Sequence, residues 1–153
     1  MKVALDTNVL AYAEGVNGAA RQPDALALLE RLPAGSALVP VQVLGELFNV
    51  LVRKAERSPA QARAAVLGWR DAFPLIATSS AVLVAAADLA ADHGLSIWDS
   101  VIFAAASDAE CRLLLSEDMQ DGFTWGGVTV ANPFLRVLSP MLARLLSEHE
   151  KPE

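Results

Sequence analysis

The amino-acid sequence predicts an α/β protein, a three-layer α/β/α domain in which a mainly parallel sheet of about five short strands is flanked by helices. Apolar runs of three or four residues, too short to form helices, alternate along the chain with longer stretches of helical periodicity. Parallel strands need a crossover connection, which is usually a helix, so this alternation favours a parallel sheet. The predicted strands are Val3–Leu5, Ala37–Val39, Leu75–Thr78, Leu113–Leu115 and Val128–Val130.

Length and composition indicate one globular domain. The chain has 153 residues, of which 54% are hydrophobic and 20% are charged. A chain of this size buries most of its surface around a single core, and its composition does not suggest disorder. We expect a single domain over residues 1–146 and a polar C-terminal tail over residues 147–153.

Two helices are predicted in the first part of the chain. The segment Asp6-Thr7-Asn8, which follows the first strand, is typical of a turn, and a helical stretch runs from about Asp24 to Arg31. Another helix is expected from Val41 to about Glu56, because its apolar side chains recur at helical spacing on one side. Glu46 lies in the polar stripe on the other side of that helix.

Capping residues predict the next helices. The segment Ser58-Pro59-Ala60-Gln61 combines an N-cap serine, a proline at the first helical position and a capping-box glutamine, so a helix should begin there. Ser79 or Ser80 is expected to cap the following alanine-rich helix. Gly94 ends that helix, because glycine readily adopts the left-handed conformation of a C-cap.

No feature of the sequence predicts export or membrane insertion. The longest uncharged stretch, residues 72–87, is short for a bilayer span and contains a proline. A secretory signal needs an uninterrupted apolar run near the N-terminus, which Asp6 and Asn8 break. The single cysteine, Cys111, has no partner for an internal disulfide, and we expect it to be buried and structural. These observations predict a cytoplasmic protein.

Four acidic residues mark a candidate site, and each also has an ordinary structural explanation. Asp6 and Asp118 follow predicted strands, and open parallel sheets bind ligands beyond the carboxyl ends of their strands. Asp99 or Ser100 is expected to open the last predicted helix, while Glu46 faces either solvent or the same sheet edge. The alternatives are a turn or N-cap role for Asp6 and Asp99 and a solvated surface for the other two acids.

If these acids converge, their mutual repulsion must be relieved. Two carboxylates about 4 Å apart repel by roughly 4 kcal/mol at an effective dielectric constant near 20. Protonation or a bound cation removes that cost. Mg²⁺ prefers oxygen ligands and commonly uses one or two protein carboxylates, which leaves positions for water and phosphate oxygens. An all-carboxylate site therefore suits phosphodiester cleavage, a reaction that needs no histidine when metal ions are present.

Taken together, the order and spacing of these acids resemble those of a known family. The segment Leu5-Asp6-Thr7-Asn8-Val9-Leu10, Glu46 in an early helix, Asp99 opening a later helix and Ser116-Glu117-Asp118 after a strand resemble the PIN-domain nucleases, toxins of the VapC kind in particular. The resemblance spans nearly the whole chain, from Val3 to about Phe134. The catalytic acids that it implies are Asp6, Glu46, Asp99 and Asp118.

The resemblance also implies a cofactor and its surroundings. The expected cofactor is Mg²⁺ or Mn²⁺, and the segment 116–122 carries more acids than is common in the family, which adds a further candidate ligand. The implied metal ligands are Asp6, Asp99 and Asp118, with Asp121 in reserve. The implied supporting residues are Thr7, Asn8 and Ser116.

The function implied by the resemblance is that of a metal-dependent endoribonuclease, the toxin of a type II toxin/antitoxin module. Its expected partners are an RNA substrate, a cognate antitoxin protein and a second copy in a homodimer. The net charge of −6 argues against a broad, nonspecific grip on nucleic acid. Local positive charge should therefore hold the RNA, and we expect Arg53, Lys54 and Arg57 to contact phosphates, with a solvated helix face as the alternative.

Other functions agree less well with the sequence. A phosphatase of the haloacid-dehalogenase type needs a second acid two residues after the first, where Asn8 stands, and no glycine-rich nucleotide-binding motif is present. A serine or cysteine hydrolase needs a nearby histidine, but His93 falls at a predicted helix end and His149 in the tail. The remaining rival is a catalytically silent PIN-like module that binds RNA or a protein, which the presence of all four acids disfavours.

Overall fold

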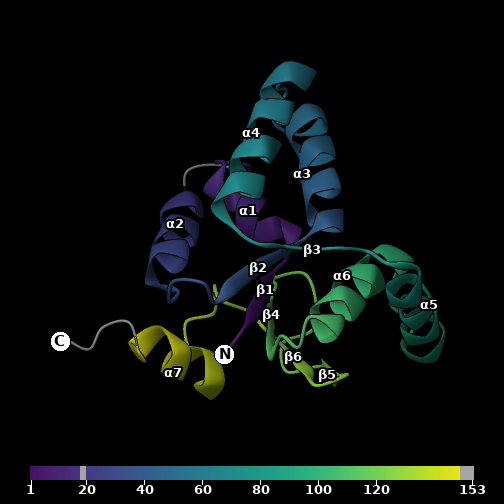
Figure 1. Ribbon diagram of the computed structural model, residues 1–153. Helices are drawn as coiled ribbons and strands as arrows, with labels where there is room; N and C mark the ends of the chain where they lie inside the picture. Colours follow the sequence, from purple (N-terminus) through teal and green to yellow (C-terminus); the bar gives the residue numbers. More distant parts are fainter. Residues whose placement is uncertain (18–19, 149–153) are drawn as a thin grey trace.

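The computed structural model describes residues 1–17 and 20–148, and its centre is a six-stranded sheet with the strand order β3-β2-β1-β4-β6-β5. Five strands are parallel, and β5 pairs antiparallel with β6 at one edge (Figure 1). The strands are β1 (Val3–Leu5), β2 (Ala37–Pro40), β3 (Leu75–Ile76), β4 (Leu113–Leu115), β5 (Thr124–Trp125) and β6 (Val128–Ala131).

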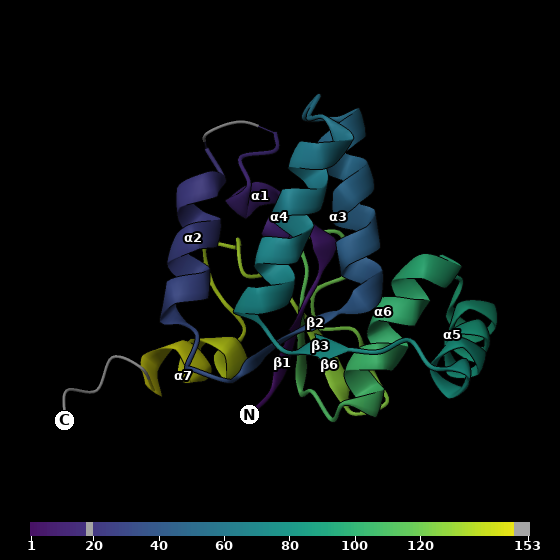
Figure 2. The ribbon, with the colours of Figure 1, turned by 45° about the horizontal axis from the view of Figure 1, so that its top comes forward.

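Helices cover both sides of this sheet. In both views α2 and α7 lie on one side and α5 and α6 on the other, while α3 packs against α4 (Figures 1 and 2). The predicted α/β class with a mainly parallel sheet is therefore confirmed, with one strand more than expected. The helices of the described residues are α1 (Thr7–Ala13), α2 (Gln22–Arg31), α3 (Val41–Arg53), α4 (Pro59–Ala72), α5 (Ser80–His93), α6 (Ile97–Asp108) and α7 (Pro140–Glu148).

The central strand β1 sets the geometry of the molecule. All residues of β1 and β4 are buried, as expected for strands covered by helices on both faces. The register pairs Val3 with Leu113 and Leu5 with Leu115. The residues that follow, Asp6 and Ser116, consequently leave the sheet side by side at its carboxyl edge.

The predicted caps are present. Ser58 and Gln61 form the complete capping box of α4, and Ser79 caps α5 by accepting a hydrogen bond from the backbone of Val82. Gly94 ends α5 in the left-handed conformation, with φ of 69°. Cys111 is buried, as expected.

Two predicted element starts are wrong, and both errors concern residues of the candidate site. The Asp6-Thr7-Asn8 segment is not a turn, because Asp6 is the N-cap of the seven-residue helix α1, which is too short to show a periodic pattern. The helix α6 does not begin at Asp99 or Ser100. Its N-cap is Ser96, whose hydroxyl accepts a hydrogen bond from the Asp99 N–H, so Asp99 lies in the first turn.

Three other elements differ from expectation. The strand β5 is missing from the prediction because its two residues, followed by Gly126 and Gly127, carry too little pattern to identify. The helix α3 ends at Arg53, three residues early. The unpredicted helix α7 continues to Glu148, so residues 147 and 148 of the predicted polar tail are helical, whereas the rest of that tail, 149–153, lies outside the described residues. No helix in the described ranges has the length and apolar character of a membrane span.

A half-buried acid connects α1 to the hairpin of α3 and α4. The Glu14 carboxylate, just after α1, accepts hydrogen bonds from Arg57 Nη1 and Trp69 Nε1, both at 2.8 Å. Its backbone carbonyl accepts a third from Arg57 Nη2 at 2.8 Å. Because Asp6 caps the other end of α1, this contact also holds the candidate site in place.

Replacing Glu14 with Gln should destabilise the fold. The change leaves the partly buried Arg57 without its counter-charge, so we expect the free energy of unfolding to fall by about 1–3 kcal/mol. Urea unfolding followed by circular dichroism measures this. The matched control is Asp71→Asn, which breaks the exposed Arg70–Asp71 pair and should cost at most about 1 kcal/mol. Equal losses in the two variants would contradict the role assigned to Glu14.

Candidate active site

The four predicted acids line one cavity at the carboxyl edge of the sheet. The cavity has a volume of about 330 Å³ and receives acids from the end of β1, from α3, from the first turn of α6 and from the segment after β4. Asn49 and Val50 of α3 complete its wall. The lining residues are Asp6, Thr7, Glu46, Asn49, Val50, Asp99 and Asp118.

Asp6 is the buried centre of the site, with only 4% of its surface exposed. Its Oδ1 accepts a hydrogen bond from the backbone N–H of Thr7 at 2.7 Å, which is the N-cap contact of α1. Its Oδ2 accepts one from the Ser116 hydroxyl at 2.6 Å and a longer one from the Asn8 amide at 3.2 Å. Three donors therefore hold the carboxylate in one orientation.

Asn8 connects Asp6 to the segment that carries Asp118. Its amide nitrogen lies 3.3 Å from Asp118 Oδ2 and 3.4 Å from Ser116 Oγ, and its carbonyl accepts from the backbone N–H of Glu117 at 3.2 Å. Ser116 Oγ also accepts from the Met119 N–H at 3.2 Å, which shapes the turn. The structure thus places the predicted supporting residues Asn8 and Ser116 in contact with the acids.

Thr7 orients the acid that comes from α3. Its hydroxyl donates to Glu46 Oε2 at 2.5 Å, so the half-buried Glu46 faces the sheet edge and not bulk solvent. Asn49 follows three residues later, which places it on the same side of α3. Glu46 and Asn49 of the predicted polar stripe therefore form part of the cavity wall.

Burial and negative charge perturb two of the acids. Burial raises the pKa of Asp6 from 3.8 to about 7, the hydrogen bonds from Ser116 and Thr7 oppose the rise, and the charges of Asp99 and Glu46 add to it. Burial also raises the pKa of Asp99, where the Ser96 hydroxyl opposes the rise and the charge of Asp118 adds to it. A cation would relieve both effects.

The donor set fits a hard divalent cation that keeps much of its water. In residues 1–17 and 20–148 no three acidic, histidine or cysteine side chains stand ready to enclose a metal ion. Mg²⁺ does not need such an enclosure, because one or two carboxylates and several waters commonly suffice. The cavity offers four carboxylates around a space wide enough for hydrated ions, and Asp6, Asp99 and Asp118 are the acids that would hold them.

The structure does not bring every predicted residue to this cavity. The reserve ligand Asp121 is absent from its lining, and its Oδ1 instead accepts the backbone N–H of Asn132 at 2.8 Å. Of the three predicted phosphate contacts, Arg53 and Lys54 are exposed at the end of α3, but the Arg57 guanidinium is bound by Glu14. The charge of Arg57 is evident in the sequence, but its partner Glu14 is distant in the chain and is brought to it only by the fold.

A match to a protein-family profile shows which family this chain belongs to. A family profile described as PIN domain matches residues 3–120. The chain belongs to the PIN domain family. This confirms the membership predicted from the four acids, and no match was found among curated proteins.

Solved structures of toxin–antitoxin proteins share this PIN fold. VapC20 of Mycobacterium tuberculosis, a toxin that cleaves the sarcin-ricin loop, is 21% identical over 76% of this chain and 92% of its own, with a TM-score of 0.65. A chain of a toxin–antitoxin complex from Klebsiella pneumoniae is 20% identical over 87% of this chain and 98% of its own, with a TM-score of 0.64. For VapBC2 of Rickettsia felis, bound to promoter DNA, the identity is 18% over 77% and 89%, and the TM-score is 0.55.

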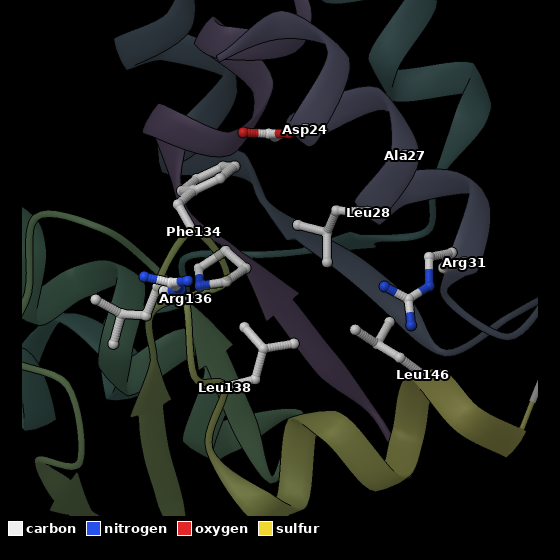
Figure 3. Close-up of a pocket in the computed structure, with 10 residues that line it drawn as sticks. Asp24, Ala27, Leu28, Arg31, Phe134, Arg136, Leu138 and Leu146 are labelled. Carbon is white, nitrogen blue, oxygen red and sulfur yellow. The ribbon is translucent and has the colours of Figure 1, made fainter. Parts of the chain in front are cut away.

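A separate cavity lies on the flank of this PIN domain. It has a volume of about 310 Å³ between α2, the segment 133–138 and α7, and contains Arg31, Arg136 and several leucines but none of the four acids (Figure 3). It therefore takes no part in the carboxylate site.

Replacing Asp6 with Asn should stabilise the metal-free protein at about pH 8 and have little effect near pH 4. Folding raises the pKa of Asp6 from 3.8 to about 7, so between these two pH values the folded protein binds more protons than the unfolded chain. The free energy of unfolding therefore falls as pH rises from 3.8 to about 7. Asn carries no charge and remains a good N-cap. Thermal unfolding in EDTA across this pH range measures the difference, with exposed Asp88→Asn as control. A gain that is independent of pH would contradict the electrostatic cause.

Proposed function

We propose that this protein is a Mg²⁺- or Mn²⁺-dependent endoribonuclease, the toxin of a toxin/antitoxin module that acts in the cytoplasm. The observation that carries the proposal is the convergence of four carboxylates from four separate elements on one open cavity. Such a cavity repels an RNA phosphate unless cations intervene, and hard divalent cations are the ions that carboxylates bind. Membership of the PIN family supports the same activity.

The residues of the chain would divide the work by position. Asp6, Asp99 and Asp118 would hold the cation, which when bound supplies positive charge to the phosphate oxygens and lowers the pKa of water. Asn8 and Ser116 would keep Asp6 and Asp118 oriented through the hydrogen bonds described above.

Glu46 would have a different task from the three aspartates. The Thr7 hydroxyl donates to its Oε2, which leaves Oε1 without this contact, and Oε1 would accept a proton from the attacking water. The hydrogen bond reduces the number of rotamers that Glu46 samples, so the proton acceptor is positioned before the substrate arrives.

The proposed partners follow from the solved structures that share this fold. The Klebsiella pneumoniae chain was solved in a toxin–antitoxin complex, and VapBC2 of Rickettsia felis was bound to promoter DNA. By analogy this protein would bind a cognate antitoxin. Kinship with the VapC toxins further implies that the antitoxin covers the acidic cavity and that the protein forms a homodimer. RNA would be the substrate, as it is for VapC20.

A catalytically silent PIN-like module that binds RNA or a protein is the competing proposal. The burial of Asp6 disfavours it, because a buried carboxylate beside other acids costs stability unless a ligand uses it. In a silent module the buried Asp6 carboxylate would lower stability with no function to offset the loss.

Cleavage of RNA should depend on both the cation and the acids. Purified protein, free of any co-expressed partner, should cut a mixed RNA pool with Mn²⁺ or Mg²⁺ and stop in EDTA. Asp6→Asn, Asp99→Asn and Asp118→Asn should each lower the rate by at least about 100-fold, because loss of a ligand exceeds the 10- to 100-fold effect of losing an outer partner. Sequencing the fragment ends measures the cleavage sites.

The matched control for this experiment is Asp121→Asn, which removes an equal charge outside the cavity and should cut normally. Intact RNA in every lane, from a protein that binds Mn²⁺ by calorimetry, would favour the silent module. Undiminished cleavage by Asp6→Asn would reject the carboxylate site itself.

Positive charge at the end of α3 should contribute to RNA affinity. Arg53→Glu and Lys54→Glu should each weaken binding of single-stranded RNA and lower the slope of log K against log salt by at least about 0.7, the share of one phosphate contact. Filter binding at several salt concentrations measures this. The control is Arg112→Glu. Arg112 is exposed and lies just before β4, at the amino ends of the parallel strands and away from the carboxyl edge that holds the acids. Equal effects at Arg112 would show that only net charge matters.

A further inference from the structure

A smaller cavity opens directly beside the carboxylate cavity. Its volume is about 140 Å³, and it shares Thr7, Val50 and Asp118 with its neighbour. The remaining lining comes from α1, from the turn after α1 and from the end of α3. These residues are Asn8, Ala11, Tyr12, Val16, Asn17 and Lys54.

The walls of this cavity differ in character from those of the acid site. Ala11, Val16 and Val50 supply an apolar surface and Tyr12 an aromatic ring, whereas Asn17 supplies an amide. The volume equals that of roughly five liquid waters at about 30 Å³ each. A single planar ring with apolar faces and polar edges matches a space of this size and composition.

Contacts behind Tyr12 hold its ring in place. Its hydroxyl donates to Glu117 Oε1 at 3.1 Å, and its ring meets Phe134 edge to face, with centroids 5.4 Å apart. The guanidinium of Arg21 lies over Phe134 and 3.7 Å from Glu117, which closes the set of contacts. A ring that is already ordered loses little conformational entropy when another ring stacks on it.

Lys54 places a positive charge at the rim of the same cavity. It follows α3 as its C-cap residue, is exposed, and makes no ion pair with any residue in the ranges 1–17 and 20–148. Arg57, three residues later, is in contrast bound to Glu14. Lys54 is therefore a cation next to the acids that remains available to a phosphate.

From this arrangement we propose that the smaller cavity receives one base of the RNA, that of a nucleotide adjacent to the phosphate being cleaved. The base stacks on Tyr12, its polar edge meets Asn17, and Lys54 binds its phosphate. Proteins recognise single-stranded RNA in this way, by stacking unpaired bases on aromatic rings and bonding to their edges. The inference rests on the proposed function for its substrate class, and it assigns to that enzyme a source of base preference.

The side-chain amides of Asn8 and Asn17 belong to different cavities. Asn8 already bonds to Asp6, Ser116, Asp118 and Glu117, so it belongs to the acid site. The Asn17 side chain makes no hydrogen bond with the described residues, and Asn17 adopts a left-handed conformation, with φ of 63°. Asparagine tolerates that conformation better than most residues. Because its side-chain amide is not used within the described residues, Asn17 would be the group that distinguishes one base edge from another.

Nucleoside monophosphates test this site without any cleavage. AMP, GMP, CMP and UMP are titrated into ¹⁵N-labelled full-length protein with Mg²⁺, and ribose 5-phosphate, which lacks a base, serves as the reference ligand. At least one nucleotide should bind about 5- to 150-fold more tightly than ribose 5-phosphate, the range expected for stacking of one base. The amides of Ala11, Tyr12 and Val16 should shift.

Variants identify the groups responsible. Tyr12→Leu should abolish the preference for nucleotide over ribose 5-phosphate, while Tyr12→Phe, which keeps the ring and loses the hydroxyl, should retain it. Lys54→Met should weaken all five ligands alike, because it removes a phosphate contact. The spectrum of each variant shows at once whether it is folded.

Two results would overturn the assignment. One is equal affinity of the wild type for ribose 5-phosphate and all four nucleotides, and the other is an unchanged preference in Tyr12→Leu. The RNA cleavage assay is a separate readout, so the two proposals fail independently. Base preference without cleavage would reject the nuclease and leave the base site, whereas cleavage without base preference would reject the base site alone.

Discussion

The structure of the site depends on one buried carboxylate, that of Asp6. Its Oδ1 caps α1 and its Oδ2 binds the Ser116 hydroxyl, so a single side chain connects the end of β1 to the first helix and to the segment after β4. The parallel register of β1 and β4 makes this contact possible, because it brings Asp6 and Ser116 to the same edge of the sheet. Asn8 then extends the connection to Asp118.

This arrangement carries an electrostatic cost that is informative about function. Burial raises the pKa of Asp6 to about 7, and the charges of Asp99 and Glu46 add to the effect. Near neutral pH the charged form of this carboxylate therefore lowers the stability of the fold. An N-cap alone requires no burial and no neighbouring acids, since Ser96 and Ser79 perform that task in the same chain with neutral hydroxyls. The four acids together support the proposal of a positively charged ligand.

The positive charges of the chain divide into structural and available groups. Arg57 is bound by Glu14 between α1 and the α3–α4 hairpin, whereas Lys54 stands at the rim of the smaller cavity. A protein with a net charge of −6 that binds RNA must rely on such local cations and on contacts with bases. Binding by a few local contacts favours selectivity for particular RNA sequences over tight nonspecific binding.

The sequence by itself determined the α/β class, the family and the identity of the four acids, because short apolar runs, serine caps and the spacing of acids are local patterns that one chain displays directly. It misplaced the start of α6 by two to three residues and missed α1, β5 and α7, since short elements carry little periodicity. Only the tertiary structure decided that Asp121 lies outside the cavity and that the Arg57 guanidinium binds Glu14. It also decided that Tyr12 and Lys54 border a second cavity. Those facts depend on contacts between residues far apart in the chain, and the distances that decide them arise only when the strands pair and the helices pack.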